Sequence, residues 1–111
     1  MTTTVPEAPD ISTPAKVQAA QRKFLRTVAA LAQTLPPPKS LSVSVGSSGR
    51  MTGSLSFDTI ADVEAWAGQL GTTIADRFPM DDGTRTVVTA YGYLAGIHVQ
   101  IIGSEPTGGV S

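Results

Sequence analysis

The chain has 111 residues, enough for one domain, and its hydrophobic content of 41% and charged content of 15% are typical of a globular protein. The absence of cysteine excludes disulfide bonds, thiolate zinc ligands and a thiol nucleophile. No apolar run approaches the ~20 residues of a membrane-spanning helix, and the first residues lack the basic and apolar regions of a signal peptide. We therefore expect a cytoplasmic protein without membrane contact.

The two ends of the sequence differ in composition from its middle. Residues 1–12 and 104–111 are polar and rich in proline, glycine, serine and threonine, so we expect a disordered N-terminal tail and a flexible C-terminal tail. Residues 13–103 carry the periodic apolar positions and are expected to form a single α+β domain. The lack of asparagine and the excess of arginine over lysine indicate a GC-rich genome, such as that of an actinobacterium or one of its phages.

Residues 14–35 are expected to form the first helix. Thr13 suits the N-cap position and Pro14 the first helical position, where a missing N–H costs nothing. Apolar residues recur at helical spacing along one face of this segment: Val17, Phe24, Val28, Leu31 and Leu35. The prolines at 36–38 end the helix, because a residue before proline is driven out of the α region.

A β-hairpin and a second helix follow. Residues 40–46 and 50–57 alternate between apolar and small polar residues, and the Gly-Ser-Ser-Gly segment between them has turn composition. Asp58 is expected to cap the second helix and Gly71 to end it at the C′ position. The apolar residues of this helix recur on one face: Ile60, Val63, Trp66, Ala67 and Leu70. This spacing predicts that Trp66 is buried against the sheet.

Three further strands are expected at residues 72–78, 85–94 and 97–103, the last two being the most β-prone segments of the chain. A turn at Asp81, Asp82 and Gly83 would join the first two of these strands. The element order is then α-β-β-α-β-β-β, and short links between strands favour antiparallel neighbours. The prediction is an α+β fold with a mostly antiparallel five-stranded sheet and helices packed on it.

The last hairpin carries the candidate binding site. If Ala95 and Gly96 form a two-residue turn, Leu94 lies opposite Ile97 and one face of the hairpin is a continuous aliphatic core. The other face then presents the candidate site residues Tyr91, Tyr93, His98 and Gln100, together with Thr89, Val87 and Ile102. Aromatic rings with polar groups beside an imidazole are typical of binding surfaces.

Two alternatives to a binding surface are open for this face. The first helix could cover it, and we favour this arrangement because such residues more often simply pack. A three-residue turn would instead shift the register and place Tyr91 and Tyr93 on the same face as Ile97 and Val99. The register of the hairpin and the position of the first helix therefore decide whether a site exists here.

The charges divide between the two halves of the chain. Between residues 11 and 57 all charged residues are basic, whereas acids predominate in residues 58–111. Some of the cations fall on the side of the first helix opposite its apolar residues, and we call them the basic face: Lys16, Arg22, Lys23 and Arg26. Such a face could lie on nucleic-acid phosphates. No recognition motif accompanies these few cations, so a solvated face or a contact with acidic groups of a neighbour is favoured.

No pattern in the sequence marks a catalytic or cofactor site. His98 is the single histidine, which rules out a site with two histidine ligands, and no serine lies in a nucleophile-elbow motif. The glycine motifs that bind phosphates and dinucleotides are absent as well. We therefore expect a non-enzymatic interaction module that binds a protein partner or associates with itself, without metal or cofactor. The alternatives are a nucleic-acid-binding accessory protein that uses the basic face, and a small-ligand or catalytic domain centred on His98.

Overall fold

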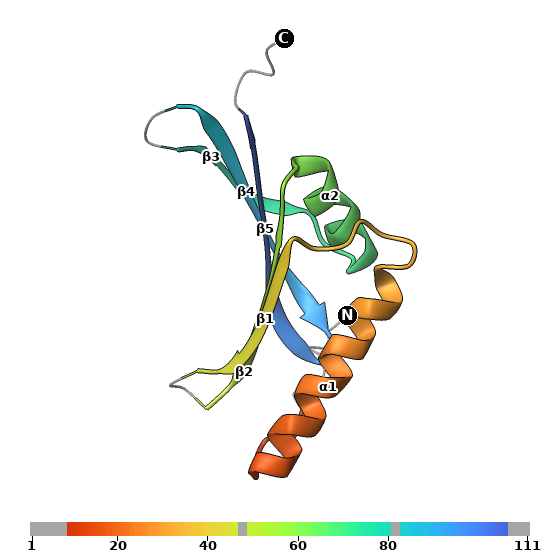
Figure 1. Cartoon of the computed structure of the whole chain (residues 1–111). Coiled ribbons are helices and arrows are strands. Elements are labelled where there is room, and N and C mark those ends of the chain that lie inside the picture. Colours follow the sequence, from red (N-terminus) through yellow and green to blue (C-terminus); the bar gives the residue numbers. More distant parts are fainter. Residues whose placement is uncertain (1–8, 47–48, 81–82, 107–111) are drawn as a thin grey trace, which may run out of the picture.

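The computed structural model describes residues 9–46, 49–80 and 83–106 of the chain. Two helices lie on one face of a five-stranded sheet in an α+β fold (Figure 1). The helices are α1 (Pro14–Leu31) and α2 (Ile60–Gln69), and the strands are β1 (Ser40–Val45), β2 (Met51–Phe57), β3 (Ile74–Pro79), β4 (Arg85–Leu94) and β5 (Ile97–Pro106). The predicted fold class and element order are confirmed.

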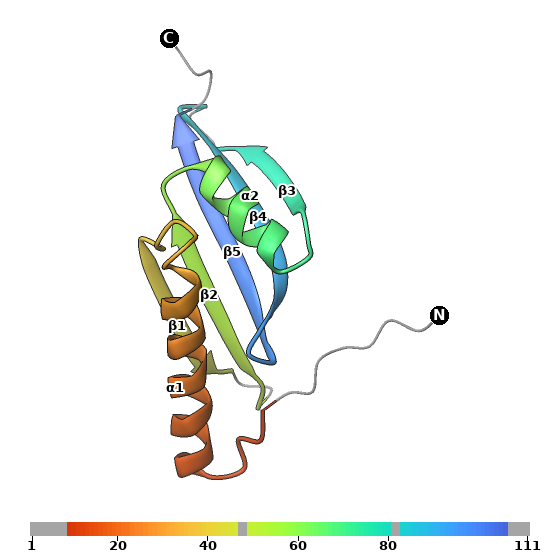
Figure 2. The ribbon, with the colours of Figure 1, turned by 90° about the vertical axis from the view of Figure 1, so that its right-hand side faces the viewer.

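The sheet is mixed, with the strand order β1-β2-β5-β4-β3. The hairpin pairs are antiparallel, as the short links predicted, whereas β2 and β5 run parallel. The chain leaves β2 through α2, crosses to the far edge at β3 and returns through β4, so that β5 lies beside β2 at the centre of the sheet (Figure 2). The parallel pair follows from this crossover.

The first helix begins as expected and ends earlier. Thr13 caps α1, since its Oγ1 accepts a hydrogen bond from the Lys16 N–H at 3.2 Å. The helix ends at Leu31 rather than at residue 35, because the chain then tightens into turns in which the Thr34 N–H donates to the Leu31 carbonyl at 3.1 Å. This tightening leads directly into the prolines.

The second helix is capped by a different residue from the one expected. Thr59 caps α2 by accepting a hydrogen bond from the Asp62 N–H at 3.2 Å, whereas Asp58 forms an exposed ion pair with Lys39 at 3.3 Å. A carboxylate oxygen of Glu105 also accepts the Ile60 N–H at 2.7 Å, which ties the start of α2 to β5. At the other end Gly71 has a φ of +75°, and this confirms its predicted C′ position.

Several segments assigned to tails or turns lie differently in the structure. β3 starts at Ile74 rather than at residue 72, and β5 continues past residue 103 because Ser104, Glu105 and Pro106 pair with β4. Near the other terminus, Ile11 packs against the core. The remaining expected tail residues 1–8 and 107–111, and the turn residues 47–48 and 81–82, lie outside the described residues.

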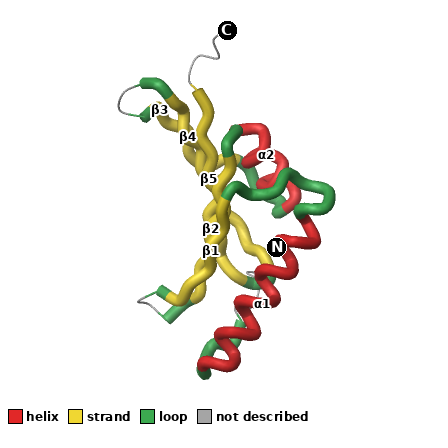
Figure 3. Tube along the Cα trace, viewed as in Figure 1, coloured by secondary structure: helices red, strands yellow, loops and turns green. Residues whose placement is uncertain are grey.

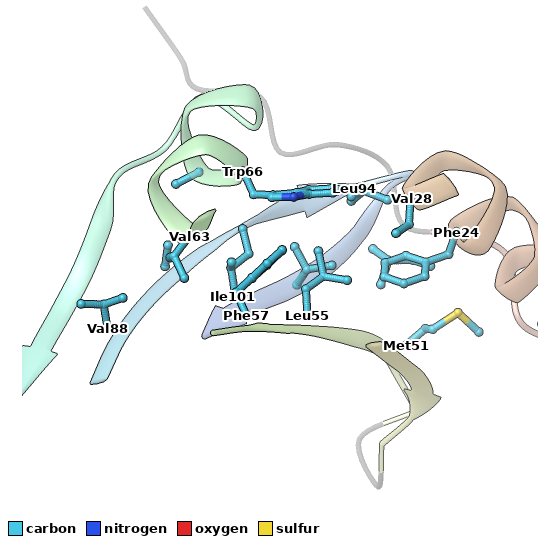
Figure 4. Packing of buried hydrophobic residues seen from close by; sticks show 14 of the residues in the cluster. Phe24, Val28, Met51, Leu55, Phe57, Val63, Trp66, Val88, Leu94 and Ile101 are labelled. Carbon is cyan, nitrogen blue, oxygen red and sulfur yellow. The ribbon is translucent and has the colours of Figure 1, made fainter. Parts of the chain in front are cut away.

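The core fills the space between the two helices and the sheet. Trp66 of α2 and Phe24 of α1 are both fully buried and reach from their helices toward the sheet (Figure 4). The indole Nε1 of Trp66 donates a hydrogen bond to the Pro36 carbonyl at 2.6 Å, so the one polar atom of this ring is satisfied. The predicted burial of Trp66 is confirmed.

The turn between β4 and β5 has a backbone that favours glycine at both central positions. Ala95 has a φ of 54° and Gly96 a φ of 79°, the signs of a type I′ turn. An L-residue in this region costs roughly 1–2 kcal/mol relative to its usual conformation. The hairpin therefore tolerates local strain at Ala95.

We expect the substitution Ala95→Gly to raise the free energy of unfolding by about 0.5–1 kcal/mol, because glycine adopts the positive φ without strain. The substitution Ala95→Val is expected to lower it, since a β-branched side chain is disfavoured at a positive φ. Urea denaturation of both variants measures the difference. Equal stability of the two variants would contradict this account of the turn.

Candidate functional site

The β4–β5 register places the candidate site residues on one face of the sheet. Leu94 lies opposite Ile97, as the two-residue turn predicted, and the pairing continues with Tyr93 opposite His98 and Tyr91 opposite Gln100. The alternative register with a three-residue turn is therefore wrong. We call the sheet face that carries Tyr91, Tyr93, His98 and Gln100 the open face.

The first helix lies on the opposite side from the open face. A Cβ added at Gly53 would lie 2.7 Å from the Phe24 ring and 3.1 Å from the Val99 side chain, so α1 packs closely on the aliphatic face. Both helices lie on that same side of the strands (Figure 3). The favoured expectation that α1 covers the tyrosines is therefore wrong. The apolar side of α1 buries more hydrophobic surface against the aliphatic face than it could against tyrosine and histidine.

The imidazole of His98 lies between two tyrosine rings. The ring centroids of His98 and Tyr91 are 5.9 Å apart with the planes tilted by only 10°, and those of His98 and Tyr93 are 5.3 Å apart at 68°. Both tyrosines remain 40% exposed. This cluster therefore combines stacked aromatic area with hydroxyl and imidazole groups on exposed residues.

Toward the other end of β4 the open face carries apolar and charged residues. Phe78 on β3 lies opposite Val87, and its ring is 48% exposed. Asp76 pairs with Thr89 on the same face, and Arg85 at the start of β4 donates to Ser104. The aromatic cluster and this end together extend along most of β4.

The half of the open face on β1 and β2 carries only hydroxyl side chains. Thr52 pairs in register with His98, and Ser54 pairs with Gln100. The full set is Ser40, Ser42, Ser44, Thr52, Ser54 and Ser56. The Oγ atoms of Ser40 and Ser56 form a hydrogen bond across the two strands. The open face is thus a hydroxyl area joined to an aromatic area.

The basic face lies on α1, away from the open face. All four of its cations are exposed, while α1 turns Ala20, Phe24 and Val28 into the core. Lys16 forms an ion pair with Asp10 at 2.7 Å, and its hydrogen bond, together with those from Ser12, lowers the pKa of Asp10 to about 2. Within the described residues, Arg22, Lys23 and Arg26 form no ion pair.

A hollow lies between α2 and β3, on the side of the sheet that the helices cover. Its volume is about 380 Å³. Its lining consists of Glu64, Ala67, Gly68, Thr72, Thr73, Ile74 and Arg77, and it includes no residue of the aromatic cluster.

In the described parts of the chain, no three His, Asp or Glu side chains gather as metal ligands. No helix in those same ranges is long and apolar enough to cross a membrane.

The described residues form two layers and thereby define the class of protein, which is an α+β fold with both helices on one face of a mixed five-stranded sheet. The chain matches no protein-family model, no curated protein and no solved structure.

Proposed function

We propose that the protein is a non-enzymatic interaction module whose open face binds a protein partner. The observation that carries this proposal is the position of Tyr91, Tyr93 and His98 on the sheet face opposite the helices. Tyrosine is enriched at protein interfaces because its ring supplies contact area and its hydroxyl supplies a hydrogen bond. The exposed ring of Phe78 adds apolar area beyond the cluster, and the hydroxyl groups of β1 and β2 border it with polar side chains, as the polar rim of an interface does.

The distribution of charge favours a protein over a nucleic acid on this face. A single-stranded nucleic acid needs aromatic platforms together with cations that contact the phosphates. Here the aromatic cluster lies on the sheet, whereas the exposed cations Arg22, Lys23 and Arg26 lie on α1 in the other layer. Two further cations, Arg50 and Arg85, have the register of the open face, and the Arg85 guanidinium donates to Ser104. Most of the cations that could contact phosphates therefore lie away from the aromatic cluster.

The surroundings of His98 also favour binding over catalysis. A histidine that acts as a general base is usually oriented by a carboxylate or a carbonyl on its second nitrogen. The residues that pair with His98 in the sheet are Tyr93 and Thr52, and neither is charged. The tyrosine rings instead hold the imidazole through stacking and edge contacts, as in an anchoring cluster.

The substitutions Tyr91→Ala and Tyr93→Ala are each expected to weaken association by about 1–3 kcal/mol, because aromatic anchors carry much of the energy of an interface. The partner is found by placing a photo-crosslinking residue at position 93 in the source cell. Position 25 is the matched control, since Leu25 on α1 is 44% exposed and Tyr93 is 40% exposed. Affinity of the crosslinked partner is then measured for each variant beside its thermal melt.

Crosslinks of equal yield from both positions would count against the open face, as would tyrosine variants that unfold without changing association.

A further inference from the structure

The two edges of the sheet are protected to different extents. At the β3 edge, the pairing shifts between Ile74 and Asp76, and the strand carries Arg77 and Pro79. Bulges, charges and prolines are the usual devices that prevent an edge strand from pairing with another chain. Strand β1 itself has none of them, although Pro38 and Lys39 directly precede it: its sequence is Ser-Leu-Ser-Val-Ser-Val, and its pairing with β2 is unbroken.

The backbone phase of β1 shows which groups face outward. The Gly46 N–H donates to the Arg50 carbonyl at 2.8 Å, which marks 46 and 50 as a hydrogen-bonded pair. Such pairs alternate along an antiparallel ladder, so Ser44 and Ser42 also direct their backbone groups toward β2. Leu41, Val43 and Val45 therefore direct their N–H and C=O groups away from β2, toward the edge where no described strand pairs.

The same residues leave apolar side chains exposed. Leu41 is 38% exposed and Val45 is 42% exposed, although both point to the helix-covered side of the sheet. Helix α1 lies closer to β1 than to the other strands, yet the helix leaves the Leu41 and Val45 side chains partly uncovered. An uncharged edge with outward hydrogen-bonding groups and exposed aliphatic side chains is suited to pair with a strand of another chain.

We propose that β1 pairs antiparallel with β1 of a second copy of this chain, centred on Val43. In this register Leu41 of each copy lies opposite Val45 of the other, and the outward backbone groups of Leu41, Val43 and Val45 all find partners. Registers shifted by two residues leave one of these outward residues without a partner. Since β1 carries no charge, no like-charge repulsion opposes the pairing of identical strands.

The symmetry of this pairing determines the shape of the dimer. Pairing of Val43 with its own copy requires a two-fold axis perpendicular to the sheet, so both pairs of helices lie on one side. Both open faces then lie together on the other side, on one continuous sheet.

Specific interfaces bury roughly 1,200 Å² or more in total, and a contact of two short strands with flanking aliphatic groups falls at the low end. We therefore expect a dissociation constant on the order of micromolar.

The test is sedimentation equilibrium of the whole protein across a range of concentrations. We expect twice the chain mass for the wild type at high concentration. The variant Val43→Pro removes an N–H that the ladder with β2 does not use, so it should fold and raise the dissociation constant at least tenfold. A second variant, Leu41→Lys with Val45→Lys, should do the same by placing charges on the edge. Met80→Lys is the matched control, because Met80 is 45% exposed beside the other edge, and it should dimerise like the wild type.

Amide hydrogen exchange locates the contact. The Leu41, Val43 and Val45 amides should become protected as the concentration rises, whereas the Ser42 and Ser44 amides should be protected throughout. A wild type that stays monomeric, or β1 variants that dimerise with wild-type affinity, would overturn the proposal. The tyrosine variants of the open face should leave the dimer intact, so this result and the open-face experiment succeed or fail separately.

Discussion

The substitution Trp66→Ala is expected to lower the free energy of unfolding by about 3–5 kcal/mol. Trp66 is the largest fully buried side chain among the described residues, and its ring contacts Phe57 with centroids 5.9 Å apart. Its removal opens a cavity between α2 and the sheet, and it also leaves the Pro36 carbonyl without its donor. Chemical denaturation followed by circular dichroism measures the loss.

The variant Trp66→Phe makes a smaller change at the same site. It keeps an aromatic ring in the site and removes the indole N–H, so we expect an intermediate loss of about 1–3 kcal/mol. A loss under about 1 kcal/mol for Trp66→Ala would show that α2 does not pack through this residue.

The substitution Gly103→Ala is expected to cost about 3 kcal/mol, the upper end of the usual range for overpacking. A Cβ at this position would lie 2.4 Å from Val63 Cγ2 and 3.0 Å from the Thr59 carbonyl oxygen. Val63 is fully buried and Thr59 is the N-cap of α2, so neither can move aside without shifting the helix. This clash exceeds the roughly 0.5–1 kcal/mol that alanine ordinarily gains over glycine within a strand.

Gly68→Ala is the matched control for this prediction. Gly68 lies within α2, and nothing is within 4 Å of the Cβ that alanine would add. We therefore expect the opposite sign, a gain of about 0.5–1 kcal/mol from helix propensity. Thermal melts of the two variants under identical conditions make the comparison. Destabilisation of both by the same amount would mean that the close approach of α2 to β5 is not what makes Gly103 sensitive.

Much of the candidate site was predictable because it depends on local geometry. Alternation with a period of two separated Tyr91 and Tyr93 from the aliphatic residues of β4, and the two-residue turn at Ala95 set the partner of each. Local geometry does not decide whether another element covers the site. The first helix is amphipathic, and its apolar side could pack on either face of the sheet. The apolar area that each face offers decides between them.

The residues by themselves determined where helices and strands form, that Trp66 is buried, and that the tyrosines share a face with His98, because periodicity, caps and turns act over a few positions. Only the tertiary structure decided the parallel pairing of β2 with β5, the side on which α1 packs and the position of β1 at the edge of the described sheet. These features join segments far apart in the chain, and the burial of apolar area over the whole molecule selects among them. The close approaches at Gly53 and Gly103 have the same origin, since a glycine shows its need for space only when another element packs against it.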